Sequence, residues 1–105
     1  MNTDLSAALD RVAQRFIARM PALLEAMRRA ATDDESAGQQ ELRQGAHNIA
    51  GLAPTLGMTG TGAAAATLEA MVSGSVPPPT DRRLAAIDAI DAAFNVECAA
   101  RGIAG

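Results

Sequence analysis

The sequence predicts an all-α protein, an antiparallel up-down four-helix bundle. Nearly a quarter of its residues are alanine, the strongest helix former. Two phenylalanines are the only aromatic residues, and no stretch alternates apolar and polar residues as a half-buried strand does. Apolar residues instead recur at helical spacing in several segments joined by short breaks. The 105 residues are enough for one domain with one core, predicted to span residues 1–105.

The first predicted helix begins at Thr3 or Asp4, either of which can cap it, and ends at about Ala31. Pro21 interrupts it, because proline removes one helical hydrogen bond. Two arrangements remain open: an extra short N-terminal helix that ends near Arg19, or one long helix with a kink. Its apolar positions are Leu5, Leu9, Val12, Phe16, Ile17, Met20, Leu23, Leu24 and Met27.

The second helix is predicted from about Ser36 to Leu56, after a polar break at residues 32–35 that offers several capping side chains. Pro54 cannot donate a hydrogen bond and crowds the carbonyl of Ala50, so a bend is expected near Ala50. Gly57 favours the end of this helix.

The third and fourth helices are separated by a proline-rich segment, residues 76–79, which is expected to be a stiff, extended connector. Thr61 can cap the third helix. Thr80 or Asp81 can cap the last helix, which is expected to end near Gly102. Four amphipathic helices with short connections make up the predicted bundle.

Composition excludes several classes of function. The net charge of −3 argues against a nucleic-acid-binding surface. No signal peptide, transit sequence or membrane-spanning run is recognisable, so a cytoplasmic protein without membrane contact is expected. The single cysteine, Cys98, has the helical spacing of a small core residue, with a reactive thiol as the alternative. One histidine and one cysteine provide no set of metal ligands, so no metal site is expected.

The segment Ala46–Gly51 contains the only histidine, and a helical wheel places it on the outside of its helix. At about 100° per residue, an apolar stripe lies within about 60° of Ile49, and His47 lies about 160° away. The histidine is therefore expected to face water. The stripe consists of Leu42, Gly45, Ala46, Ile49, Leu52, Ala53 and Leu56. The residues around His47 are Gln40, Arg43, Gln44, Gly51 and Pro54.

Three interpretations of an exposed His47 are open at this point. It is an ordinary surface residue, a metal ligand, or a nucleophile that accepts and passes on a phosphoryl group. The metal interpretation lacks partner residues. A neutral imidazole is a good nucleophile near neutral pH. In-line phosphoryl transfer also needs space for the acceptor, which Gly51 provides, while Arg43 can offset the charge of the phosphoryl group.

The histidine motif continues into a longer pattern. His47-Asn48-Ile49-Ala50-Gly51 is followed by Gly57 and then by the pair Leu68-Glu69 on the next predicted helix. This pattern resembles the histidine-containing phosphotransfer (HPt) domain family, and the resemblance extends roughly from Val12 to Met71. It implies a four-helix bundle whose histidine is phosphorylated reversibly on the ring nitrogen that faces solvent.

The resemblance also implies roles for the neighbours of His47. Gly51 gives clearance at the histidine, and Glu69 matches the position whose carboxylate can orient the ring through its other nitrogen. Ala50 departs from the pattern, because many members carry lysine or another polar residue there. Arg43 is the candidate substitute for stabilising the phosphoryl group. The surface expected to bind a partner consists of Gln40, Gln44, Ala50, Gly51 and Pro54.

By the same resemblance, the chain shuttles a phosphoryl group through His47 in a bacterial-type multistep phosphorelay. Its expected partners are the receiver domains of a hybrid histidine kinase and of a response regulator. No intrinsic cofactor is expected, and Mg²⁺ is expected on the partner receiver domain. No glycine-rich phosphate loop is present, so we expect a phosphoryl carrier without ATP-dependent kinase activity. A monomer is expected, because a carrier must expose its site to its partners. The alternative, favoured by Ala50, is a non-catalytic helical bundle that binds a receiver or kinase without phosphotransfer.

Overall fold

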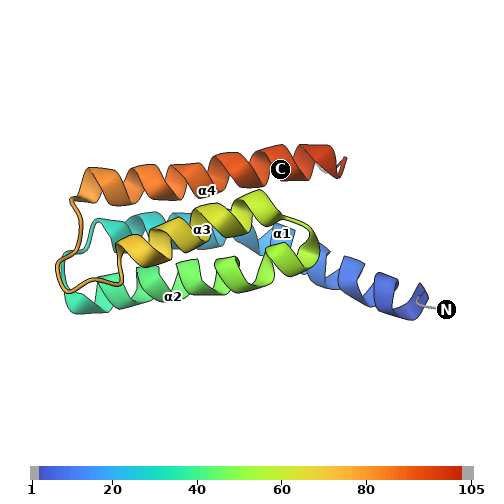
Figure 1. Cartoon of the computed structure of the whole chain (residues 1–105), viewed down its shortest axis with the longest axis horizontal. Helices are drawn as coiled ribbons and strands as arrows, with labels where there is room; N and C mark the ends of the chain where they lie inside the picture. The colour runs from blue at the N-terminus through green and yellow to red at the C-terminus, as the bar shows by residue number, and fades with distance from the viewer. Residues whose placement is uncertain (1–2, 103–105) are drawn as a thin grey trace.

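The computed structural model describes residues 3–102, which form four α-helices and no strand. The helices are α1 (Thr3–Ala31), α2 (Ser36–Leu52), α3 (Thr59–Met71) and α4 (Thr80–Ala100), and a short 3-10 helix, η1 (Pro54–Leu56), follows α2. Successive α-helices run in opposite directions (Figure 1). The predicted all-α, up-down four-helix bundle is confirmed. Across this part of the chain, no helix is both long and apolar enough to span a membrane.

α1 is one continuous helix of 29 residues with Pro21 inside it. The extra short N-terminal helix is therefore wrong. Pro21 lies on the exposed side of the helix. Water can therefore form a hydrogen bond with the backbone carbonyl that lacks a donor because proline has no N–H. Met20 and Leu24 are buried on the opposite side of the helix. Thr3 and Asp4 both lie within the first turn, so the helix does not begin with either of them as its cap.

α2 ends at Leu52, earlier than the predicted Leu56. Because Pro54 cannot donate to the carbonyl of Ala50, the chain leaves the α-helix there and continues as η1 instead of bending within one helix. Gly57 ends η1 with a φ of 81°, a left-handed conformation that glycine adopts without steric cost. The predicted stop at Gly57 is thus confirmed as the end of η1.

α3 begins at Thr59, so the prediction that Thr61 caps it is wrong. The cap comes from α4: the carboxylate of Glu97 accepts hydrogen bonds from the backbone N–H of Gly60 (2.9 Å) and of Thr61 (2.7 Å), and from the Thr61 hydroxyl. Burial would raise the pKa of Glu97, but these hydrogen bonds outweigh it and hold the pKa below its ordinary value. Glu97 therefore satisfies free N–H groups of a helix far away in sequence.

α4 begins at Thr80, with Pro79 in the N-cap position, so neither Thr80 nor Asp81 is the cap. The Thr80 hydroxyl instead accepts a hydrogen bond from Arg83 at 2.7 Å. The buried Arg83 guanidinium also donates to Asp34 at 2.8 Å. These contacts join the start of α4 to the α1–α2 connection.

The core lies between the four helices and is built largely from aliphatic, thioether and alanine side chains. Phe16 of α1 and Phe94 of α4 meet edge to face, with ring centroids 6.5 Å apart. Cys98 is fully buried and its pKa is raised by that burial, which agrees with a core residue and not with a reactive thiol. Arg28 of α1 forms ion pairs with Asp88 (3.1 Å) and Asp91 (3.0 Å) of α4.

Candidate functional site

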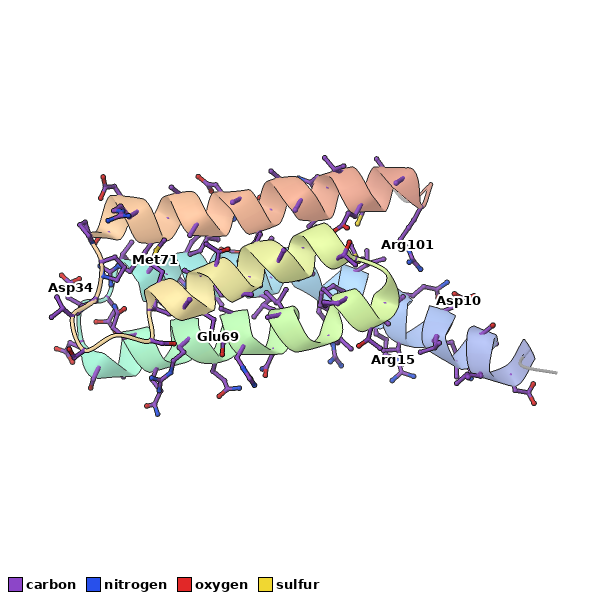
Figure 2. The ribbon with its side chains drawn as sticks, viewed as in Figure 1. Asp10, Arg15, Asp34, Glu69, Met71 and Arg101 are labelled. Atoms are coloured by element: carbon purple, nitrogen blue, oxygen red, sulfur yellow. The ribbon has the colours of Figure 1, made fainter. Side chains whose placement is uncertain are left out.

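His47 lies on the exposed face of α2, and its imidazole contacts a carboxylate of α3. Nδ1 of His47 is 2.6 Å from Oε2 of Glu69. The histidine side chain is 66% exposed and the glutamate side chain 31%. Figure 2 shows Glu69 on α3 at the side where that helix meets α2. The site therefore lies at the solvent edge of the contact between these two helices.

The packing between α2 and α3 fixes the positions of both side chains. Ala46 and Ile49, which flank His47, are buried in the core, and this sets the rotation of α2 about its axis. Leu68, next to Glu69, is also fully buried and sets the rotation of α3. The small buried side chains Ala46 and Ala65 allow the two helices to approach closely. A rigid core thus holds the imidazole and the carboxylate together at its edge.

The contact with Glu69 determines which nitrogen of the imidazole has a free lone pair. An ionised carboxylate can only accept a hydrogen bond, so a hydrogen bond between these side chains requires the proton on Nδ1 of His47. In the neutral ring, Nε2 then keeps the lone pair. A nucleophilic nitrogen is therefore available on an exposed ring whose orientation is fixed by its other nitrogen.

The surroundings of His47 are open on the side of Gly51. A Cβ atom at Gly51 would meet nothing within 4 Å, and the residue is exposed one turn after the histidine. On another flank, Gln44 donates a hydrogen bond from Nε2 to Oδ1 of Asn48 at 3.0 Å. The acceptor or donor of a transferred group can therefore approach over Gly51 without displacing protein atoms.

The structure separates the other predicted site residues. Arg43 and Gln40 line a cavity of about 390 Å³ between the start of α2 and the α3–α4 connector, whose lining also includes Val72 and Pro77. Within residues 3–102, Arg43 forms no ion pair with a carboxylate. It lies one turn before His47 along the helix, but its side chain borders this cavity.

The predicted partner surface is only partly exposed. Gln40, Gln44, Gly51 and Pro54 are exposed, whereas Ala50 is half-buried. Pro54 lies beyond the end of α2 and packs on α3, because a side chain at Gly62 would come within 2.5 Å of the proline ring. The ring of Pro54 thus packs against α3. A helical wheel of α2 does not reveal this contact, because it does not show the neighbouring helices.

A groove between α1 and α2 was not predicted from the sequence. It has a volume of about 270 Å³ and lies beside Asn48, the residue that follows His47. Leu52, expected in the core stripe of α2, is 38% exposed at this groove, so that prediction is wrong. The spacing of apolar residues could not have revealed the groove, because it does not say which of them the neighbouring helix covers. The lining residues are Val12, Arg15, Phe16, Arg19, Leu23, Asn48, Ile49 and Leu52.

The carboxylates and the histidine do not gather into a metal centre in the portion of the chain that the structure describes. No three His, Cys, Asp or Glu side chains there are arranged to hold a metal ion.

One family model, described as the Hpt domain, matches residues 11–95 of the chain. The matched region includes all of α2 and α3, and with them His47, Gly51 and Glu69. No curated protein and no solved structure gives a significant match.

Proposed function

The chain belongs to the Hpt domain family, the histidine phosphotransfer proteins of phosphorelays, and on that basis we propose that Nε2 of His47 receives and donates the phosphoryl group. The observation that carries the proposal is the 2.6 Å contact of Nδ1 with Glu69. It leaves Nε2 as the nucleophilic atom of an exposed ring, beside the open space at Gly51.

The proposed transfer is one in-line displacement at phosphorus. The lone pair of Nε2 attacks the phosphorus of an aspartyl phosphate, an N–P bond forms, and the P–O bond to the aspartate breaks. The aspartate leaves as a carboxylate, and the proton on Nδ1 stays on the ring. The phosphorylated ring is then a cation, and the Glu69 carboxylate at 2.6 Å stabilises it. Transfer to a second aspartate reverses these steps.

The proposed partners are receiver domains, one of a hybrid histidine kinase and one of a response regulator. Each would dock over the exposed face of α2 that carries Gln40, Gln44 and Gly51. The Mg²⁺ that assists the aspartyl phosphate would be held by the receiver. The chain would act in the cytoplasm as a phosphoryl carrier.

Ala50 leaves the phosphoryl group without the cation that many members supply from this position, and Arg43 is the residue we assign to that role. It lies one turn before His47 on the same helix, and it has no carboxylate partner within residues 3–102. A long guanidinium side chain in that position can swing toward a phosphoryl group on Nε2.

The alternative function is a bundle that binds a receiver without accepting its phosphoryl group. To test between the two, the purified chain is incubated with receiver domains from the same genome that carry a radiolabelled aspartyl phosphate. We expect acid-labile, base-stable label on the wild-type chain and none on His47→Gln. Equal label on both chains, or a receiver that binds the wild type tightly but transfers no label to it, would overturn the proposal.

A further inference from the structure

α1 projects beyond the bundle that it helps to form. Its 29 residues span about 43 Å, whereas the 17 residues of α2 span about 25 Å. None of residues 4–12 is buried, and Ala13 is the first buried residue of the helix. Figure 1 shows this N-terminal part of α1 extending past the connection between α2 and α3. We call residues 4–12 the overhang.

The overhang carries a stripe of large apolar side chains that nothing in the described chain covers. Leu5 is 58% exposed, Leu9 41% and Val12 38%. These three residues lie within about 60° of arc on a helical wheel, so they form one continuous stripe. Solvated apolar residues are common singly, but an aligned set on a projecting helix points to a partner surface.

The stripe leads directly into the groove between α1 and α2. Val12 belongs to both, and the groove continues along the same side of α1 to Phe16 and Leu23. The only charged residues that line the groove are Arg15 and Arg19. The groove is therefore an apolar channel with a positive edge, and its size of about 270 Å³ suits a few large side chains.

We propose that the overhang of one copy of this chain lies antiparallel along the groove of a second copy, and the second copy's overhang lies in the first groove. Pairing Leu9 with Val12 of the second copy sets the register. The same register places Leu5 opposite Phe16 of the second copy, at the wall of the groove. The exchange is symmetric, as an interface between two identical chains requires.

Charge supports a second copy as the occupant. Asp4 lies on the same flank of the stripe as Arg15 and Arg19, all three within about 60° of arc. When two antiparallel helices are related by a two-fold axis, the same flank of each helix lies beside the same flank of the other. The register above then places Asp4 between the levels of Arg15 and Arg19 of the second copy, about 3 Å along the axis from each. On this flank the overhang thus carries Asp4 at the level of the two groove arginines, while Arg11 lies near the two-fold axis, facing Arg11 of the second copy.

The test is the mass of the full chain by sedimentation equilibrium over a range of concentrations. We expect a concentration-dependent rise from 10.7 kDa toward twice that value. Leu9→Glu places a charge at the centre of the interface in both copies, so the dissociation constant should rise about 100-fold or more. Val96→Glu is the matched control, since Val96 is 69% exposed on α4, away from the overhang, and it should leave the constant unchanged.

A charge exchange identifies the occupant and its register. Asp4→Arg and the paired change Arg15→Asp with Arg19→Asp should each weaken the dimer, and the triple variant should recover most of the loss because it restores opposite charges across the interface. A chain of 10.7 kDa at all concentrations up to millimolar would overturn the proposal. A dimer that Leu9→Glu leaves intact, or one that the triple variant does not restore, would overturn it as well.

Discussion

Nδ1 of His47 and Oε2 of Glu69 lie 2.6 Å apart, and this contact joins the exposed edge of α2 to that of α3. Both side chains project from helices whose rotation is set by fully buried neighbours, Ala46 on one side and Leu68 on the other. The imidazole therefore needs no reorganisation of the bundle to present Nε2 to a partner. The proposed chemistry depends on this positioning, so most of the predictions address it.

Glu69→Ala should slow phosphoryl transfer to His47 by about 10-fold or more, because the ring loses the acceptor that fixes its orientation and tautomer. Glu69→Gln keeps an acceptor oxygen but loses the charge, so its loss should be smaller. The rates are measured with a labelled receiver domain, and nitrogen NMR of the ring reports the tautomer. A positioning role requires the Nδ1–H form to dominate in the wild type and to diminish in Glu69→Ala. An unchanged tautomer and rate would mean that Glu69 does not orient the ring.

Gly51→Leu should reduce transfer by at least about 10-fold, since a large side chain would fill the open space through which a receiver approaches. The fold should remain intact, because Gly51 is exposed and a Cβ atom there has no neighbour within 4 Å. Gly51→Ala is the matched control and should raise the free energy of unfolding by about 0.5–1 kcal/mol through its helix propensity. Transfer is measured with the receiver and stability by urea unfolding. Full transfer by Gly51→Leu would contradict the clearance argument.

Arg43→Ala should shorten the lifetime of the phosphorylated histidine by several-fold, because it removes the cation assigned to the phosphoryl group. The half-life of the label is measured after the receiver has been removed. Arg29→Ala is a suitable control, since that exposed arginine pairs with Glu25 on α1 instead. Equal half-lives for Arg43→Ala and the wild type would rule out this role.

Glu97→Gln should destabilise the bundle by about 1–2 kcal/mol at pH 7, because an amide caps the start of α3 less well than a carboxylate. The pKa of Glu97 in the folded chain is below its ordinary value of 4.5. Its stabilising contribution is therefore fully present above pH 4.5 and disappears as the pH falls through the lowered pKa. Urea unfolding at several pH values checks this: the two chains should converge in acid. A constant difference across that range would show that the cap is not responsible.

The sequence was sufficient to predict the fold class and the exposure of the histidine. Both depend on helical periodicity, and the periodicity around Ile49 is strong. Contacts between distant segments decided the remaining features. The start of α3 is capped by Glu97 from α4, so the capping preference of Thr61 predicted the wrong cap. The neighbours of Pro21 are held in the core, so the helix continues past a residue type that usually ends or kinks a helix. No local pattern shows that Leu52 stays exposed at the groove with α1.

The central claim, that Nε2 of His47 carries the phosphoryl group, is tested most directly by NMR of the phosphorylated chain with its histidine ring isotope-labelled. Phosphorus should couple to Nε2, while Nδ1 retains its proton and its contact with Glu69. The His47→Gln chain, treated with the same phosphorylated receiver, should give no phosphohistidine signal. Phosphorus coupled to Nδ1, or a wild-type chain without any phosphohistidine signal, would contradict the account.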